Sequence, residues 1–379
     1  MPRTVRRLGY RSLQLDALRE MMQDPNFAPG PSPEPIVADP WIVSSLLQKS
    51  IRRGETEIAQ RAALTLFNFR GAAIWRRFMV ITFEDVGIGS VDAVTTTVAA
   101  GSDAAARKAC GGDLRVAVNL ARILAEAPKD RSSDHIVGAK DHPSLARDAG
   151  TMASASMAAL LSCVRDRALD LPCQAIAAWF ASGIGDGALH KGALGELLAV
   201  FRDLGVPEDL VVATGIAATR TREPITVMVP LIWLAAHKSM RRGVCDCPVP
   251  PLVMAGAVPL YALDEHTRLG REAIWRLACE NDAVRTCLER FVPEGRRRRA
   301  ANVAAFYADA APLARRLVWA QSESLEAFGI ERDLLLAGVA AEGIGPLLEA
   351  VRANLGQLNE LRTKIFGRAR GMPAGMVVP

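Results

Sequence analysis

Residues 39–54 read DPWIVSSLLQKSIRRG, and this stretch carries a complete set of signals for one amphipathic helix. Asp39 can cap the helix because its carboxylate accepts hydrogen bonds from free first-turn amides, and Pro40 suits the first turn, where no amide hydrogen is needed. Gly54 supplies the stop. Between these signals, apolar residues recur at helical spacing: Ile42, Leu46, Leu47 and Ile51. The stretch predicts a helix with one buried face.

Similar patterns continue along the chain, broken by glycines and prolines, while strand signals are few. Half of the 379 residues are hydrophobic and only 5% are aromatic, and alanine, leucine and arginine favour helices because they lose little side-chain freedom there. We therefore predict an all-α protein built as a multi-helix array. The longer predicted helices include residues 145–164, 298–320 and 334–366.

Breaks in the pattern divide the chain into five parts. Prolines crowd residues 24–40, and charge, two cysteines and three prolines cluster at residues 241–251. The predicted parts are an N-terminal helix and proline-rich tether (1–40), a helical domain (41–137), a helical continuation (138–240), a C-terminal helical domain (252–367) and a flexible tail (368–379).

The composition indicates a reduced compartment and a modest positive field. Seven scattered cysteines without an export signal are typical of a cytoplasmic protein, and the longest apolar stretch, residues 225–236, is too short to cross a bilayer. The 46 basic and 41 acidic residues give a formal net charge of +5, so location matters more than total charge. We expect no membrane partner and no cofactor.

Two motifs in a fixed order resemble a known family. The stretch SSLLQKSIRRG (44–54) is followed by WRRFMVITFEDVG (75–87), and a helix then leads to the turn Ala127-Pro128-Lys129. This order resembles the C-terminal region of the replication-associated recombination protein A family, the bacterial relative of Werner helicase-interacting protein. In that family the region builds a helical collar behind an AAA+ ATPase. The resemblance implies a clamp-loader-collar-like domain at residues 41–137, oligomerisation and work at DNA.

The ATPase itself has no counterpart in these residues. A phosphate-binding P-loop needs a glycine-rich turn ending in Gly-Lys-Ser/Thr, so that backbone amides and the lysine surround the phosphates. The sequence contains no Gly-Lys dipeptide. The chain is therefore not a conventional P-loop ATPase, and a separate replication or repair ATPase is a possible partner.

The first shared motif carries basic residues near its end, and the second carries two acidic residues near its end. Lys49, Arg52 and Arg53 lie at a helix end and have two readings: contact with a phosphate backbone or partner subunit, or an ordinary exposed helix end. Glu84 and Asp85 lie near a helix C-terminus, where the dipole disfavours acids.

Ion pairing explains the two acids better than catalysis does. We expect Glu84 and Asp85 to form structural ion pairs with Arg76, Arg77 or a neighbouring helix.

Arg296, Arg297, Arg298 and Arg299 form an uninterrupted basic run, which we call the arginine run. Arginines bind phosphates, and the nearby aromatics Phe306, Tyr307 and Trp319 are either base-stacking groups or core residues. Trp319 lies among Leu313, Leu317 and Val318, which favours burial. The arginine run is the best candidate for a nucleic-acid contact.

A second polar cluster supports a different class of function. Asp264, His266 and Arg268 lie between apolar runs and provide ingredients for acid–base or phosphodiester chemistry, since an acid can tune a histidine and an arginine can hold an anion. The alternative is a helix entrance capped by Asp264 or Thr267, with Arg268 on the surface.

Cys245 and Cys247, with His266 downstream and His237 upstream, could supply zinc ligands. Zinc sites usually combine two close ligand pairs, and only one is present, so buried thiols or a proline-rich turn explain the pattern better. Our main expectation is therefore that the chain holds no metal.

From these patterns we expect a non-catalytic, homo-oligomeric or partner-binding factor in DNA replication, recombination or repair that contacts DNA through basic patches. Two alternatives stay open. One is an enzyme that uses Asp264, His266 and Arg268, and the other is a helical scaffold that binds only proteins.

Overall fold

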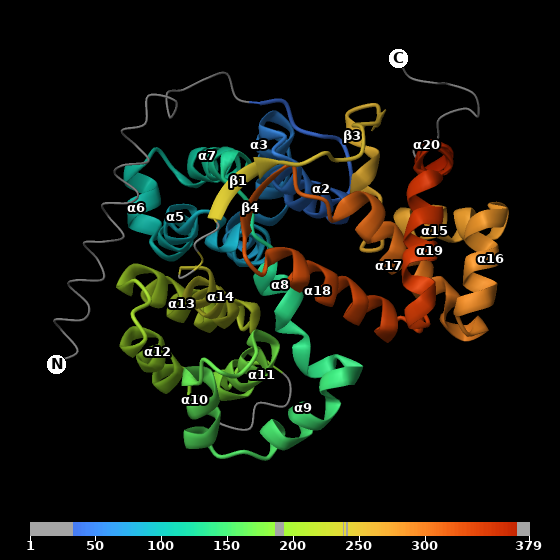
Figure 1. The fold of residues 1–379 in the computed structure, drawn as a ribbon. Coiled ribbons are helices and arrows are strands. Elements are labelled where there is room, and N and C mark those ends of the chain that lie inside the picture. Colours follow the sequence, from blue (N-terminus) through green and yellow to red (C-terminus); the bar gives the residue numbers. More distant parts are fainter. Residues whose placement is uncertain (1–32, 186–192, 238, 240–241, 370–379) are drawn as a thin grey trace.

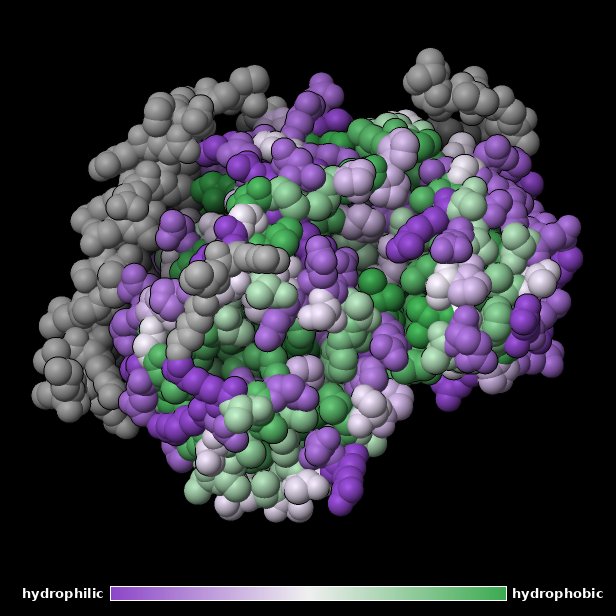
Figure 2. Space-filling view, viewed as in Figure 1, coloured by the Kyte–Doolittle hydropathy of each residue, from purple (hydrophilic) through white to green (hydrophobic). Residues whose placement is uncertain are grey.

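The computed structural model describes residues 33–185, 193–237, 239 and 242–369, and it confirms the all-α prediction. Helices gather in three groups, each around its own apolar core (Figure 1). The predicted N-terminal helix falls outside the described residues, as does most of the predicted tail. Polar side chains line the right-hand rim of the face in Figure 2, over the third group.

The first group begins with the helix that the sequence signals define. The Asp39 carboxylate accepts hydrogen bonds from the amides of Trp41 (2.8 Å) and Ile42 (3.1 Å), and Gly54 ends the helix with φ of +69°. The helices of this group are α2 (Pro40–Arg53), α3 (Thr56–Arg70), α4 (Ile74–Ile81), α5 (Val91–Ser102), α6 (Ala104–Ala109) and α7 (Asp113–Glu126). The buried face of α2 packs on α3 and α7.

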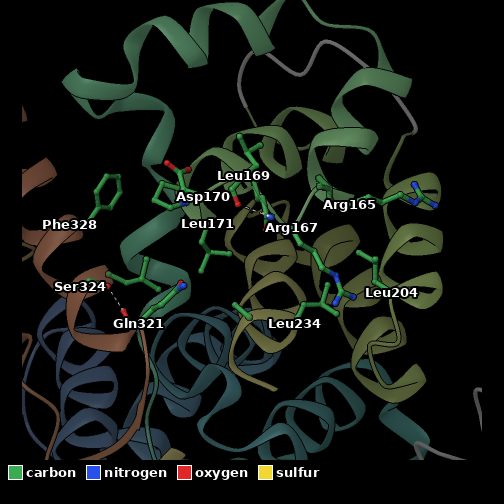
Figure 3. Close-up of a pocket in the computed structure, with 15 residues that line it drawn as sticks. Arg165, Arg167, Leu169, Asp170, Leu171, Leu204, Leu234, Gln321, Ser324 and Phe328 are labelled. Atoms are coloured by element: carbon green, nitrogen blue, oxygen red, sulfur yellow. Dashed lines mark hydrogen bonds between the residues drawn. The ribbon is translucent and has the colours of Figure 1, made fainter. Parts of the chain in front are cut away.

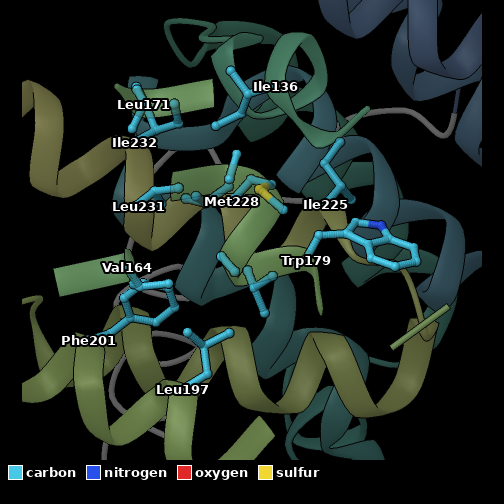
Figure 4. Close-up of a cluster of buried hydrophobic side chains, with 14 of the residues drawn as sticks. Ile136, Val164, Leu171, Trp179, Leu197, Phe201, Ile225, Met228, Leu231 and Ile232 are labelled. Carbon is cyan, nitrogen blue, oxygen red and sulfur yellow. The ribbon is translucent and has the colours of Figure 1, made fainter. Parts of the chain in front are cut away.

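The second group surrounds the most apolar helix, α14 (Ile225–His237). Its core, drawn in Figure 4, combines Leu171, Trp179, Phe201 and Met228 from three helices. Alanines on α11 let neighbouring helices approach closely, because their side chains are small. The other helices are α8 (Ser132–Val137), α9 (Ala146–Ala153), α10 (Met157–Arg165), α11 (Leu171–Ser182), α12 (Leu194–Asp203) and α13 (Glu208–Thr221).

The third group closes the right-hand side of Figure 1. Its core is built mainly of alanine, leucine and valine from the chain after residue 268. These helices are α15 (Arg268–Glu280), α16 (Asp282–Phe291), α17 (Arg297–Ala305), α18 (Ser322–Leu336), α19 (Ile344–Ala353) and α20 (Leu355–Ala369).

A short antiparallel ribbon lies where the sequence predicted a helix end. β1 (Arg242–Asp246) pairs with β4 (Arg315–Trp319), with Arg242 opposite Trp319 and Asp246 opposite Arg315. A second, smaller pair joins β2 (Met254–Ala255) to β3 (Val258–Pro259). The predicted helix 298–320 is thus wrong beyond its first half, because α17 ends in a π-helical turn, η9 (Phe306–Ala310), and Pro312 has no amide hydrogen to continue it.

Two other predicted helices are also divided. The helix predicted at 145–164 breaks at residues 154–156, where Ser156 caps α10 through its hydroxyl group. The helix predicted at 334–366 covers the end of α18 and all of α19, and it reaches into α20; Gly338, with φ of +94°, makes the first break. In each case the helical spacing of apolar residues continues across the turn. Only a capping residue or a glycine with positive φ marks the place where the helix ends.

The cores do not follow the chain in simple blocks. The first core takes in residues 258–263 and Phe366, which come from far along the chain, and Leu317 and Trp319 join the second core. Trp319 is 3% exposed, in agreement with its predicted burial. The first two cores therefore combine residues from distant parts of the chain, whereas every buried residue of the third core lies between residues 273 and 365.

No single helix in the described part of the chain is long and apolar enough to cross a membrane. The segments Ser322–Leu336 and Ala341–Ala353 reach that length and apolar composition only when they are taken together, and they are bent by 113° relative to each other.

Gly329 on α18 provides a test of how the second and third groups pack. A Cβ atom there would lie 2.6 Å from His135 Nδ1 and 2.9 Å from His135 Cα on α8. Gly329→Ala should therefore lower the free energy of unfolding by about 1–3 kcal/mol through overpacking. Gly150→Ala on α9, where a Cβ meets nothing within 4 Å, should instead raise it by up to about 1 kcal/mol.

Urea unfolding followed by circular dichroism measures both changes. Equal stabilities for the two variants would contradict the close approach of α18 to α8.

Candidate functional site: a buried charged centre and the cleft beside it

The most unusual feature of the interior is a lysine–aspartate pair. Lys49 Nζ lies 2.6 Å from Asp264 Oδ2, and their side chains are 2% and 1% exposed. Ser45 connects to both, accepting a hydrogen bond from Lys49 (2.7 Å) and lying 3.3 Å from Asp264 Oδ1. Burial lowers the pKa of Lys49 despite the nearby carboxylate. Burial alone would raise the pKa of Asp264, but Lys49 and neighbouring hydrogen bonds outweigh it and lower that pKa.

A second set of ion pairs surrounds Asp85, which is fully buried. Arg52 Nε lies 2.6 Å from Asp85 Oδ1, and Arg52 Nη2 lies 2.7 Å from Glu84 Oε1. Arg131 Nε approaches the same Asp85 oxygen at 3.3 Å, and its Nη2 also pairs with Asp134. We define the charged centre as Lys49, Arg52, Glu84, Asp85, Arg131, Asp134 and Asp264.

Local structure explains why these residues meet. Lys49 and Arg52 are three residues apart on α2 and so share one face. Glu84 and Asp85 lie in a π-helical turn, η3 (Thr82–Val86), a kind of turn that is frequent at functional sites. The chain around Asp130 returns to this turn, with the Asp130 amide 3.1 Å from the Asp85 carbonyl oxygen. Arg52 also donates to the Ala310 carbonyl oxygen (3.3 Å), which ties the third group to the first.

The structure places Lys49, Arg52 and Arg53, which the sequence offered as DNA contacts or as an exposed helix end, inside the protein. Their exposed fractions are 1%, 2% and 6%, and each cation is paired with a carboxylate. Arg53 pairs with Glu55 (2.9 Å) and stacks on Tyr261, with 4.6 Å from its guanidinium carbon to the ring centre. All three side chains lie on the buried face of α2. The presence of basic residues near a helix end does not reveal which face of the helix they occupy.

Glu84 and Asp85 form ion pairs, but not with Arg76 or Arg77. Arg76 is exposed and pairs with Glu223 at 2.8 Å. Arg77 donates to the Gln48 side-chain oxygen. The partners of the two acids are Arg52, from α2, and Arg131, from the loop before α8, so pairing with neighbouring elements replaces pairing within the helix.

A cleft of about 230 Å³ opens beside the charged centre, and we call it the charged cleft. Phe306 forms its aromatic wall: the guanidinium carbons of Arg52 and Arg131 lie 5.3 and 5.5 Å from the ring centre. The His266 ring meets the same ring edge-on at 5.8 Å. The lining residues are Glu84, Arg131, Asp134, Glu265, His266, Arg299, Val303, Phe306, Tyr307, Asp333 and Leu336.

The charged cleft brings together three stretches that sequence analysis treated separately. Glu84 comes from the motif shared with the recombination family, His266 from the polar cluster at 264–268, and Arg299 from the arginine run. Sequence reasoning named these residues but had no signal that would place them together.

The proposed set of Asp264, His266 and Arg268 is not assembled as an acid–base site. Asp264 is paired with Lys49 and lies 4.0 Å from His266 Nε2, while Arg268 and His266 both line a hollow of about 600 Å³ that Asp264 does not line. Thr267 caps α15 by accepting from the Gly270 amide (3.1 Å), as the helix-entrance reading expects.

Glu265 is the acid that sequence reasoning missed. Its Oε1 lies 3.8 Å from His266 Nε2. Burial, followed by the neighbouring Asp264, raises the pKa of Glu265 to about 7, and burial lowers the pKa of His266 to about 4. A carboxyl group that titrates near neutrality beside a neutral imidazole can exchange protons with a bound group. In the sequence, Glu265 is marked only by its position next to Asp264, and the sequence does not show that Asp264 is buried.

No metal site forms from the cysteine pair within the described residues. Cys245 Sγ and Cys247 Sγ lie 3.5 Å apart, but no group of three or more histidine, cysteine or acidic residues is placed to hold an ion there. His266 lines the charged cleft and His237 stacks on Trp233 at 4.3 Å. The described residues therefore do not bring Cys245, Cys247 and His266 together as one set of ligands.

The arginine run differs from the buried cations in its surroundings. Arg296, Arg298 and Arg299 are exposed and Arg297 is half-buried, and none of the four forms an ion pair with a described residue. The nearby aromatics do not reach the surface as stacking groups, since Phe306, Tyr307 and Trp319 are 8%, 5% and 3% exposed. The arginine run therefore presents charge without a base-stacking platform formed by those three rings.

A larger hollow of about 540 Å³ lies between α10, α14 and α18, and Figure 3 shows its lining. Leu169, Leu171, Leu234 and Phe328 supply its apolar walls. Arg165 on its edge is neutralised by Asp203 at 2.7 Å. This hollow lacks the concentration of titrating groups that marks the charged cleft.

The fold and the site define an all-α protein whose helical groups are held together by buried ion pairs. Compared with known proteins, the chain matches no protein-family model, no curated protein and no solved structure.

The Lys49–Asp264 pair can be tested by a double-mutant cycle. Lys49→Met leaves a buried carboxylate without its partner and should cost about 3–5 kcal/mol of unfolding free energy. The double variant with Asp264→Asn should lose less than the sum of the two single changes. Urea unfolding measures all three, and Arg165→Ala, which removes an exposed ion pair, serves as a control with little expected effect. Additive losses would mean that the two charges do not stabilise one another.

Lys129 gives a pH-dependent test at the Ala-Pro-Lys turn. Its ammonium is 1% exposed and donates to the carbonyl oxygens of Ala125 (2.9 Å) and Ala127 at the end of α7. Burial lowers the pKa of Lys129 to about 7.

Between that pKa and the unfolded value near 10.5, the unfolded state binds more protons, so stability from this site rises with pH. The unfolding free energy of the wild type minus that of Lys129→Met should increase by about 1–2 kcal/mol from about pH 7 to about pH 9. A difference that stays constant over this range would show that the pKa of Lys129 is not depressed.

Proposed function

We propose that this chain is a non-catalytic helical factor that assembles with itself or a partner and contacts DNA through the arginine run, in replication, recombination or repair. The observation that carries the DNA contact is the contrast between two sets of cations. Lys49, Arg52 and Arg53 are buried and paired, whereas Arg296, Arg298 and Arg299 of the arginine run are exposed and form no ion pair with a carboxylate of the described residues. Exposed arginines that are not neutralised are available for phosphates.

The resemblance to the recombination protein family supports the cellular setting. The motif residues Lys49, Arg52, Glu84 and Asp85 make contacts with one another or with adjoining elements inside the protein. This arrangement gives the motif a structural role, so the resemblance bears on fold more directly than on DNA contact. The DNA contact rests on the arginine run.

Exposed apolar side chains support assembly. Val37, Trp41 and Phe69 are 70%, 69% and 53% exposed. The start of α2 and the end of α3 adjoin, since the Arg70 guanidinium carbon lies 5.0 Å from the Trp41 ring centre. Large apolar groups at one place on a surface favour contact with another protein surface.

DNA binding by the purified chain should weaken with salt, because binding releases counterions from the phosphates. Replacing Arg296, Arg298 and Arg299 with alanine should lower the affinity by about ten- to a hundredfold and reduce the slope of log affinity against log salt by about 2–3. Fluorescence anisotropy on a labelled duplex over a salt series measures both. Light scattering on the same samples should give a mass above that of one chain.

The matched control replaces three arginines that already have carboxylate partners: Arg165, Arg202 and Arg285, which pair with Asp203, Glu208 and Asp282. This variant has the same change in net charge and should keep most of the affinity. Equal losses in the two variants would indicate a nonspecific effect of net charge. A monomer that ignores DNA at low salt would leave the protein-binding scaffold as the better description.

A further inference from the structure

Two thiols lie together at the end of β1, one on the strand and one directly after it. Cys245 Sγ and Cys247 Sγ are 3.5 Å apart and share a thiol–thiol hydrogen bond. Side chains two residues apart in a strand point to the same face, so the Cys-X-Cys spacing places both sulfurs on one side of the ribbon.

The two thiols differ in accessibility. Cys245 is exposed, whereas Cys247 is half-buried and lines a cavity of about 170 Å³ together with Arg131 and Arg316. Burial, followed by the neighbouring Cys245 thiol, raises the pKa of Cys247, although the Arg316 guanidinium acts in the opposite direction. An oxidant from solvent therefore reaches Cys245 first, with Cys247 held behind it.

The ribbon holds this arrangement in place. Cys245 is paired with Arg316 on β4, and the Cys247 amide donates to the Ala314 carbonyl oxygen at 2.7 Å. Arg316 is itself fixed by its ion pair with Glu326. The backbone on both sides of the thiols is thus anchored to a second segment, which keeps the sulfurs close without a covalent bond.

We propose that Cys245 and Cys247 form a reversible dithiol–disulfide site that reacts with small hydroperoxides. The Cys245 thiolate attacks one peroxide oxygen, the O–O bond breaks, and water or an alcohol leaves after taking up a proton. Cys245 is then a sulfenic acid. The Cys247 sulfur attacks the Cys245 sulfur, the S–O bond breaks, and the hydroxyl group leaves as water with the Cys247 thiol proton. With hydrogen peroxide, two thiols are oxidised to one disulfide and the peroxide is reduced to two waters.

The backbone geometry favours reversibility. Two residues of extended strand span roughly 6.6 Å between Cα atoms, which lies at the upper end of the range that disulfides bridge. Closing the bond in β1 therefore pulls on a backbone that β4 holds, and disulfides formed under such tension are readily reduced by a monothiol such as glutathione.

The test treats the purified full chain with one equivalent of hydrogen peroxide, alkylates the remaining thiols and analyses the protein and its peptides by mass spectrometry. The wild type should lose two hydrogens in the peptide that contains residues 245–247, and glutathione should restore them. In Cys247→Ser, Cys245 should stop at a sulfenic acid that dimedone traps.

Excess peroxide separates the pair from an ordinary exposed thiol. Cys247→Ser should accumulate at least about tenfold more sulfinic acid at Cys245 than the wild type, because a neighbouring thiol acts at an effective concentration of millimolar or more. Cys279, which is exposed and lies elsewhere on α15, serves as the internal comparison, and Cys279→Ser should form the disulfide as the wild type does.

Two results would overturn the proposal: sulfinic acid forming at Cys245 to the same extent in the wild type and in Cys247→Ser, or a two-hydrogen loss that maps to another pair of cysteines. Both readouts are independent of DNA binding, so they stand or fall separately from the proposed function.

Discussion

The structure depends on how the fully buried side chain of Asp85 is surrounded. A buried carboxylate is tolerated only when cations and hydrogen-bond donors surround it, and Asp85 receives Arg52, Arg131 and the Gln48 amide group. These donors come from α2 and from the loop before α8, and Arg52 also donates to the Ala310 carbonyl oxygen of the third group. Asp85 thus links α2 to the loop before α8 directly and is connected to the third group through Arg52, and the charged cleft lies beside these contacts.

Much of the fold could be predicted because its signals are local. Asp39, Pro40 and Gly54 define α2 through backbone requirements that a short stretch of sequence expresses completely. The ribbon of β1 and β4 could not be predicted in this way, because its pairing joins residues about seventy positions apart, and neither strand has a strong pattern of its own. The same limit explains the error over residues 298–320, where an apolar pattern continued beyond the real end of α17.

The candidate site shows a sharper form of this limit. Residue type identified Lys49, Glu84, His266 and Arg299 as carriers of chemistry, but type does not say whether a cation faces water or a carboxylate. Lys49 and the arginine run have the same charge and opposite environments, because one lies on the inward face of a helix and the other at an exposed helix start. Glu265 was missed for a related reason: its raised pKa comes from burial and from Asp264, both of which are properties of the folded chain.

The completion of the first core by residues far along the chain has a consequence for how the protein is made. The helices of the first group are all synthesised by residue 126, yet their core also needs residues 258–263 and Phe366. At about 5–20 residues per second, the ribosome adds the remaining chain in roughly ten to fifty seconds. Throughout that interval the first group carries an uncovered apolar surface. The core of the N-terminal half is therefore complete only after α20 has been synthesised.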